Sequence, residues 1–187
     1  MNNIHPETHT RMQLPKVSQI AIVVQDIDKA MHAYAQLWGL RKWYRLAYAD
    51  GGFVELRGKR IQNEIDIVMS YSGSLLIELI EHKGGDEDIF SEHLKQSGEG
   101  VHSVGFFVPD IDQRLKAMQT MGVGVLQYGV IKSRGGAVTT YAYLDPRGAG
   151  GILIELIQTR QFGVHLPASH FIMEIGCLTG DCQKIRV

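Results

Sequence analysis

The sequence predicts an α+β fold in which two tandem βαβββ modules form a curved, open mixed β-sheet cup with helices outside. Two repeats carry this prediction. The segment Asp26-Ile27-Asp28 recurs as Asp110-Ile111-Asp112, 84 residues later, and Ile77-Glu78-Leu79-Ile80 recurs as Ile154-Glu155-Leu156-Ile157, 77 residues later. Internal repetition of this kind indicates a duplicated structural unit. Neither copy alone is long enough to bury a good core, so we expect the two sheets to join around a shared concave space.

The first module spans residues 17–82 and begins with a strand followed by a helix. Residues 17–24 are a short apolar run rich in β-branched side chains, which is typical of a buried strand. Asp26 and Asp28 stand at the expected helix start, where carboxylates cap the chain and interact favourably with the helix dipole. Gly39 is the expected end of this helix. Further strands are expected at residues 44–48, 53–56, 65–69 and 75–80.

Residues 84–98 are expected to form a connector helix, because an acidic run precedes apolar side chains at helical spacing. The second module, residues 101–158, then repeats the order of the first. A strand at residues 101–108 leads into a helix that begins after Asp110 and ends by Gly122. Strands follow at residues 125–131, 138–144 and 152–158.

Composition argues against several classes of partner. The chain has 187 residues with 19 basic and 20 acidic side chains, a net charge of −1 and no block of like charge. We therefore expect no nucleic acid and no membrane as partner. Residues 1–16 are expected to be a mobile N-terminal arm, and they lack the apolar core of a secretory signal. Cys177 and Cys182 are the two cysteines, which predicts a cytoplasmic protein without a disulfide framework.

Residues 159–187 exceed what two modules need. They carry many apolar side chains, so we expect this C-terminal extension to pack on the domain or on a partner, as in a homodimer. The extension also contains His165, His170, Cys177 and Cys182. Their spacing fits no zinc pattern well, so incidental residues of a packed tail are favoured over a structural metal.

The heads of the two modules and their twin acidic strands resemble a known superfamily. The segments that carry the resemblance are residues 19–26 (Gln-Ile-Ala-Ile-Val-Val-Gln-Asp), residues 103–110 (Ser-Val-Gly-Phe-Phe-Val-Pro-Asp) and the two Ile-Glu-Leu-Ile runs. They resemble the vicinal oxygen chelate (glyoxalase/bleomycin resistance/dioxygenase) superfamily over residues 17–158. Residues 145–155 are closer to methylmalonyl-CoA epimerase-like members than to glyoxalase I-like ones. The superfamily includes lyases, epimerases and dioxygenases as well as non-catalytic binding proteins, so the resemblance predicts the fold more than the reaction.

The resemblance implies four metal-ligand positions, which here are Gln19, Glu78, Ser103 and Glu155. Members of the superfamily commonly have histidine at the first and third positions, and this chain has glutamine and serine. His102 precedes the serine, and a β-bulge in its strand would bring its side chain to the face of the other ligands. The alternative is a histidine at the sheet rim that contacts the helix layer. The oxygen-rich set Gln19, Glu78 and Glu155, with His102 as a candidate further ligand, would suit a divalent ion such as Mg, Mn, Co, Ni or Zn.

Glu78 and Glu155 are the candidate catalytic residues. A carboxylate in the middle of an apolar strand is costly to bury unless it is paired or bound to a cation, although a solvated strand position remains the alternative. Burial raises the pKa of a carboxyl group, and two neighbouring carboxyls push their titrations apart. Such a pair can transfer a proton next to a carbonyl, either alone or beside a metal that stabilises the enediolate.

These residues predict an isomerase, epimerase or lyase that acts on a small acyl-CoA or hydroxycarbonyl substrate, with a divalent metal ion as the expected cofactor. The alternative is a metal-free ligand-binding or sequestering protein of the same fold. Candidate residues of the substrate pocket are Ser103, Tyr48, Phe53 and Tyr141. Cations that could hold the phosphates of a CoA ester are Arg57, Lys59, Arg60 and Arg134.

Overall fold

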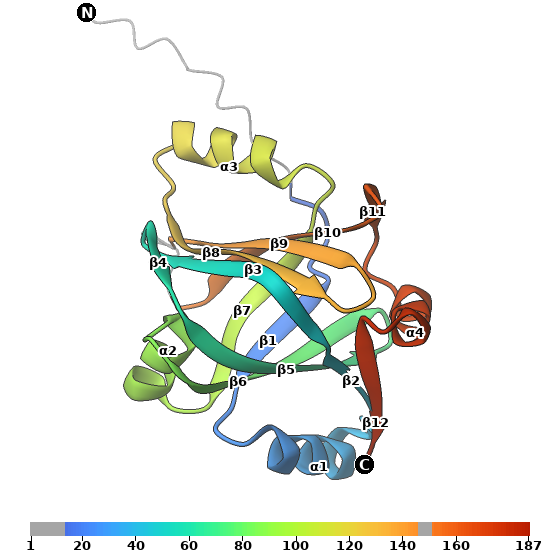
Figure 1. Cartoon of the computed structure of the whole chain (residues 1–187). Coiled ribbons are helices and arrows are strands. Elements are labelled where there is room, and N and C mark those ends of the chain that lie inside the picture. Colours follow the sequence, from blue (N-terminus) through green and yellow to red (C-terminus); the bar gives the residue numbers. More distant parts are fainter. Residues whose placement is uncertain (1–13, 146–150) are drawn as a thin grey trace, which may run out of the picture.

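The computed structural model describes residues 14–145 and 151–187. Most of the expected N-terminal arm lies outside the described residues, as do residues 146–150. Within them, one strongly curved sheet of twelve strands wraps around a concave space, with four helices outside it (Figure 1). No helix of this part of the chain is long and apolar enough to cross a membrane. The predicted α+β cup of two βαβββ modules is confirmed.

The first module and the connector comprise β1 (Gln19–Val23), α1 (Ile27–Trp38), β2 (Lys42–Leu46), β3 (Tyr48–Leu56), β4 (Lys59–Ile61), β5 (Asn63–Ser72), β6 (Leu75–Gly85) and α2 (Ile89–Ser97). The second module and the extension comprise β7 (Gly100–Phe107), α3 (Ile111–Thr120), β8 (Val125–Ser133), β9 (Ala137–Leu144), β10 (Leu153–Gln161), β11 (Val164–Leu166), α4 (His170–Thr179) and β12 (Cys182–Arg186).

The two modules join through their first strands. β1 and β7 pair antiparallel at the centre of the sheet, with Gln19 opposite Gly105 and Ala21 opposite Ser103. The last strand of each module lies parallel to its own first strand, so β6 flanks β1 and β10 flanks β7. Because side chains alternate along a strand, this register places Glu78 and Glu155 on the same concave face, one on each side of the central pair.

The β3–β4 hairpin leaves the first module and pairs with the second. The expected meander would keep residues 48–56 beside their own module, but β3 pairs antiparallel with β8, the outer strand of the other one. Gly52 permits this approach, since a Cβ there would lie 2.6 Å from the carbonyl oxygen of Val130. The hairpin therefore closes the cup further than a simple pair of half-sheets would.

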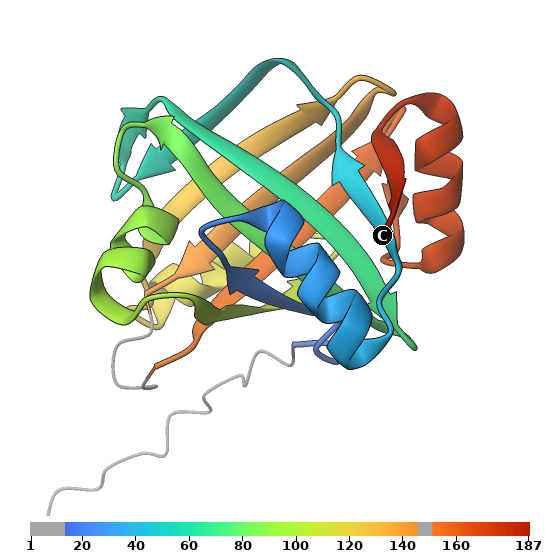
Figure 2. The same ribbon diagram turned by 90° about the horizontal axis from the view of Figure 1, so that it is seen from below.

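Two helices cover the convex face of the sheet, and Figure 2 shows α1 lying across it. Ile27 and Met31 of α1 pack against the outer side of the first module, and Ile111 and Met118 of α3 do the same on the second. Asp26 caps α1 as predicted, because its side chain accepts a hydrogen bond from the Lys29 amide at 2.9 Å. These helices fix the sheet curvature from outside and leave the concave face free for a site.

The other two helices lie at the two ends of the cup (Figures 1 and 2). α2 stands at one end and sends Ile89 and Phe90 into the inner core. α4 stands at the other end, held between β11, which pairs with β10, and β12, which pairs with β2. The C-terminal extension thus adds two strands and a helix to the module pair and covers one end of its interior.

Candidate functional site

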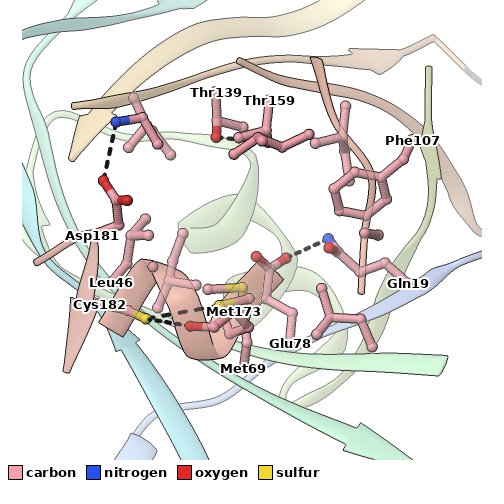
Figure 3. A pocket seen from close by; sticks show the side chains of 18 of the residues that line it. Gln19, Leu46, Met69, Glu78, Phe107, Thr139, Thr159, Met173, Asp181 and Cys182 are labelled. Atoms are coloured by element: carbon pink, nitrogen blue, oxygen red, sulfur yellow. Dashed lines mark hydrogen bonds between the residues drawn. The ribbon is translucent and has the colours of Figure 1, made fainter. Parts of the chain in front are cut away.

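The two glutamates meet on the concave face through the side chain of Gln19. The Gln19 Nε2 atom donates to Glu78 Oε2 at 2.8 Å (Figure 3). The same atom donates to Glu155 Oε2 at 3.1 Å. All three side chains are almost fully buried, with exposed fractions of 3% for Gln19, 7% for Glu78 and 5% for Glu155. The repeated Ile-Glu-Leu-Ile strands therefore build one shared acidic centre rather than two solvated positions.

Burial sets the electrostatics of this pair. Removal from water raises the pKa of Glu78 to about 8. The pKa of Glu155 is also raised well above its usual value, first by burial and then by the charge of Glu78, while hydrogen bonds from Tyr143 and Gln19 oppose the shift. Two adjacent buried carboxyls without a cation hold a proton near neutral pH, so one can donate while the other accepts.

Gly105 makes room for the amide that joins the glutamates. A Cβ at this position would lie 2.9 Å from Gln19 Cβ and 2.9 Å from Ile157 Cδ1. A side chain on the central strand would therefore push Gln19 away from the carboxyls.

A cavity of about 300 Å³ lies against the acidic pair (Figure 3). Its wall is mostly aliphatic, aromatic and thioether side chains, with Met69 and Ile67 from β5 and Met173 from α4 among them. No lysine or arginine belongs to the described lining. The C-terminal extension supplies one side of the cavity, which remains partly open to solvent.

Asp181 fastens the extension at the end of the cavity opposite the glutamates (Figure 3). Its Oδ1 accepts the Ala137 amide at 3.0 Å and the Ser133 hydroxyl, and its Oδ2 accepts Thr179 Oγ1 at 2.8 Å and Gln161 Nε2 at 3.1 Å. The four hydrogen-bond donors come from β8, β9, β10 and the extension itself, and together they satisfy this buried carboxylate. It ties the chain after α4 to the β8–β9 turn and to β10.

Two tyrosines of β9 belong to the cavity wall beside the acids. Tyr143 is paired in register with Glu155 and hydrogen-bonds to its carboxyl group. Tyr141 lies two residues away on the same face, and the two rings are 5.7 Å apart. Burial, followed by the charge of Glu155, raises the pKa of both hydroxyls, so both stay protonated. Tyr143 was not among the predicted site residues, although its spacing from Tyr141 is the signal that could have identified it.

The other predicted pocket residues lie elsewhere. Ser103, Tyr48 and Phe53 do not line the cavity, which corrects their assignment to the substrate pocket. Ser103 is fully covered beside His102, and Phe53 lies near Tyr128 with the Arg60 guanidinium above its ring. The Tyr48 hydroxyl is buried without a hydrogen-bond partner, and it lies near enough to Glu78 and Tyr141 that, after burial, their charges help to raise its pKa.

His102 occupies the predicted β-bulge, where the pairing of β7 with β1 shifts opposite Ala21. Its ring is nevertheless surrounded by aromatic neighbours, with centroids 5.2 Å from Phe90, 5.3 Å from His93 and 5.4 Å from Tyr143. Burial, and next the charge of His93, lowers the pKa of His102 to about 4. No three His, Cys, Asp or Glu side chains of residues 14–145 and 151–187 gather as a metal-binding group. In the structure His102 therefore contacts the helix layer, as the alternative prediction had it, and its role as a metal ligand stays a prediction.

The side chains that converge at this point are two carboxyls and one amide, and the amide of Gln19 turns its nitrogen toward both acids. In this arrangement they are suited to sharing a proton. Zn, Ni and Co prefer imidazole or thiolate ligands, so these residues fit them poorly, whereas Mg or Mn would need the Gln19 amide turned with its oxygen toward the cation. A divalent metal stays a prediction, and the proposed chemistry uses only the residues of the chain.

Comparisons with known proteins agree with this architecture. Residues 18–143 match the family model described as Glyoxalase/Bleomycin resistance protein/Dioxygenase superfamily. A Streptomyces coelicolor methylmalonyl-CoA epimerase in complex with 2-nitronate-propionyl-CoA is 21% identical, with 78% of this chain and 97% of that chain covered and a TM-score of 0.55. The methylmalonyl-CoA epimerase from Mycobacterium tuberculosis is 18% identical, with 77% and 87% covered and a TM-score of 0.54.

A hypothetical protein from Bacillus halodurans C-125 is 24% identical, with 76% of this chain and 92% of that chain covered and a TM-score of 0.53. Comparison with curated protein sequences gives no match. At these identities, the solved structures support the fold and leave the reaction to be argued from the site itself.

Proposed function

Because the chain belongs to the glyoxalase/bleomycin resistance protein/dioxygenase superfamily, we propose that it is an enzyme that moves a proton on a carbon next to a carbonyl. The reaction is of the epimerase, isomerase or lyase type. The observation that carries this proposal is the buried pair Glu78 and Glu155, joined by Gln19 beside a mostly apolar cavity. Two carboxyls that share a proton can act as base and acid in one turnover.

The hydrogen bonds divide the two roles. Glu155 accepts from both Gln19 and Tyr143, whereas Gln19 is the amide donor to Glu78. The charge of Glu78 raises the pKa of Glu155, but the two donors to Glu155 favour its ionised form, and on those hydrogen bonds we assign it the single negative charge and the role of base. Glu78, with a pKa of about 8, keeps its proton at neutral pH and acts as the acid. Glu155 removes the proton from carbon, the electron pair moves to the carbonyl oxygen, and Glu78 returns a proton to the substrate.

The cavity favours a hydroxycarbonyl or simple ketone over an acyl-CoA ester. A volume of about 300 Å³ lies at the small end of ligand pockets, and the described wall has no cation for a phosphate. The candidate cations are engaged outside it: Arg57 pairs with Glu92 through two hydrogen bonds, and Arg134 donates to the Tyr48 carbonyl. A compact, uncharged carbonyl compound is the proposed substrate class.

Proton exchange in deuterium oxide tests this function. The purified protein is incubated with acetoin, phenacyl alcohol and methylmalonyl-CoA, and loss of the proton signal next to the carbonyl is followed by NMR. We expect faster exchange than in buffer for at least one uncharged compound, and loss of that exchange in Glu155→Gln. Exchange of methylmalonyl-CoA alone would overturn the proposed substrate class, and exchange that persists in Glu155→Gln would overturn the role of the pair.

A ligand-binding protein is the second candidate, and the apolar cavity without the usual histidines favours it. Such a protein would bind one of these compounds with one-to-one stoichiometry and catalyse no exchange. Calorimetric titration beside the NMR assay separates the two functions, because an enzyme shows both binding and exchange.

The expected homodimer is part of the same proposal. Phe171, Ile175 and Leu178 lie on one face of α4, and two of them are largely exposed, at 71% for Phe171 and 88% for Leu178. An exposed apolar stripe of this kind supports an interface. Sedimentation velocity should show a dimer that Leu178→Lys dissociates, and a wild-type monomer would contradict it. A cytoplasmic location stays a prediction from the sequence.

A further inference from the structure

The Tyr141 hydroxyl is a buried polar group whose purpose the acidic pair does not explain. The side chain lines the cavity and is only 4% exposed, yet its hydroxyl makes no hydrogen bond of normal geometry. A buried hydroxyl without a partner is costly, so such groups in native proteins call for a reason. A ligand that enters the cavity and accepts a hydrogen bond would supply one.

A second orphan group stands behind this hydroxyl. Gln127 of β8 is fully buried, its Oε1 accepts the backbone amide of Ile89 at 3.3 Å, and its Nε2 has no partner. The Gln127 amide and the Tyr141 hydroxyl are neighbours, because a hydrogen-bonding contact with Gln127 lowers the pKa of Tyr141 against the rise that burial causes. With its oxygen held by the first turn of α2, Gln127 can direct an N–H toward the Tyr141 oxygen, which leaves the Tyr141 O–H for the cavity.

The backbone of β8 is shaped around this hydroxyl. Gly129 pairs with Tyr141 across the β8–β9 ladder, and a Cβ at this glycine would lie only 2.4 Å from the Tyr141 oxygen. The absence of a side chain lets the phenol ring lie flat against β8 with its hydroxyl in place. The position of this hydroxyl therefore depends on two residues of the neighbouring strand.

We propose that Tyr141 is the catalytic residue that donates a hydrogen bond to the carbonyl oxygen of the substrate, with Gln127 as its positioning residue. This inference rests on the proposed function and adds the group that receives the developing negative charge. Glu155 takes the proton from carbon, the electrons of that bond form a carbon–carbon double bond, and the carbonyl electrons move to oxygen. Tyr141 keeps its proton and stabilises the resulting enolate, as buried neutral donors do in oxyanion sites.

The surroundings of Tyr141 suit this role. The titratable groups that act on it are Glu155, Glu78 and Asp88, and burial together with these charges raises its pKa, so the hydroxyl remains a donor. Tyr141 also stands one ladder pair from the base: Tyr143 is opposite Glu155, and Tyr141 is opposite Ile157 on the same face. The donor and the base thus flank the same part of the cavity.

An anion that resembles an enolate tests the donor without knowledge of the substrate. The probe is para-nitrophenol, whose anion absorbs visible light and whose neutral form does not. It is titrated at neutral pH into full-length Glu155→Gln protein, in which the uncharged amide imitates the protonated base that accompanies an enolate. We expect this protein to bind the anion in preference to the phenol.

Adding Tyr141→Phe to Glu155→Gln should weaken binding of the anion at least about tenfold, the loss of one strong donor to an oxyanion. Adding Gly129→Ala should have the same effect by displacing the hydroxyl, which guards against a fold defect specific to one variant. The matched control is Tyr128→Phe, which removes a hydroxyl from the outer face of β8. Equal affinity with Tyr141→Phe, or no preference for the anion in Glu155→Gln itself, would overturn the proposal.

The NMR exchange assay keeps this result separate from the proposed function. If the wild-type protein catalyses exchange and Tyr141→Phe leaves anion binding unchanged, the proposed role of Tyr141 is wrong. The proposed role of the acidic pair would remain. If anion binding depends on Tyr141 but the wild-type protein catalyses no exchange, Tyr141 keeps its role as hydrogen-bond donor. The protein would then bind such compounds without turning them over.

Discussion

The two ends of the cavity each hold buried carboxyl groups, and their surroundings differ in kind. At one end Glu78 and Glu155 share the single amide of Gln19, with Tyr143 as a further donor to Glu155. At the other end Asp181 alone accepts four hydrogen bonds. A carboxylate with all its acceptors satisfied is a structural fastener, while a pair that is short of donors retains a proton that can react.

The largest expected effect is on the reactive end. Glu155→Gln keeps the shape and hydrogen bonds of the side chain but removes the base, so turnover should fall by roughly 100- to 10,000-fold. The exchange assay measures this loss, and circular dichroism checks that the fold is intact. The control is Glu64→Gln, an exposed position of β5. Comparable loss in both variants would mean that the pair has no special role.

The next largest effect is expected at the other end of the cavity, where Asp181 holds the C-terminal extension. Asp181→Ala leaves the donors from Ser133, Ala137, Gln161 and Thr179 without their acceptor, so the free energy of unfolding should fall by about 2–4 kcal/mol. Urea denaturation measures it, with the exposed Asp50→Ala as control. A change as small as that of the control would show that the extension is held by packing alone.

The pH dependence of stability sharpens the comparison. The pKa of Glu78 is raised from 4.5 to about 8 in the folded chain, so folding favours its protonated form. Its contribution to stability is therefore complete below pH 4.5 and is lost as the pH rises toward about 8. Urea unfolding across this range should show wild-type stability falling with pH and a flatter profile in Glu78→Gln. A wild-type profile no steeper than that of the variant would argue against a buried proton.

The smallest expected effect is the pH dependence of stability that Glu174 on α4 contributes, and its direction is opposite to that of Glu78. Hydrogen bonds from Lys184, Lys42 and Tyr44 lower the pKa of Glu174 from 4.5 to about 2. Its contribution is present above pH 4.5 and is lost as the pH falls toward about 2. Glu174→Gln should flatten the acid side of the stability profile and leave the side above pH 4.5 unchanged. Loss of stability that is uniform with pH would indicate packing rather than charge.

The two modules and the acidic centre could be predicted from the sequence because each appears there as a repeat. The twin Ile-Glu-Leu-Ile runs occupy equivalent strands, and the two-residue period of a strand puts both carboxyls on one face. The pairing of β3 with β8 could not be predicted, since nothing local in a hairpin states which distant strand it joins. The same holds for Asp181, whose donors come from elements up to 48 residues away.

The bulge at His102 shows a different limit. Its presence could be suspected from the neighbouring Gly100, but the direction of the ring depends on Phe90 and His93 of α2, which approach only in the folded chain. The irregularity of the strand could be predicted, but the side chains that surround the His102 ring could not. Tyr48 was misplaced for a related reason, because the strand that carries it leaves its own module.

Carbon-13 NMR of protein labelled at the glutamate side-chain carboxyl carbons tests the central claim most directly, because it observes the shared proton without any substrate. We predict one glutamate signal that titrates near pH 8 and is absent from Glu78→Gln, together with a shift of the Glu155 signal in that variant. If every glutamate signal instead completes its titration near the ordinary value of 4.5, the two acids hold no proton at neutral pH and the proposed chemistry fails.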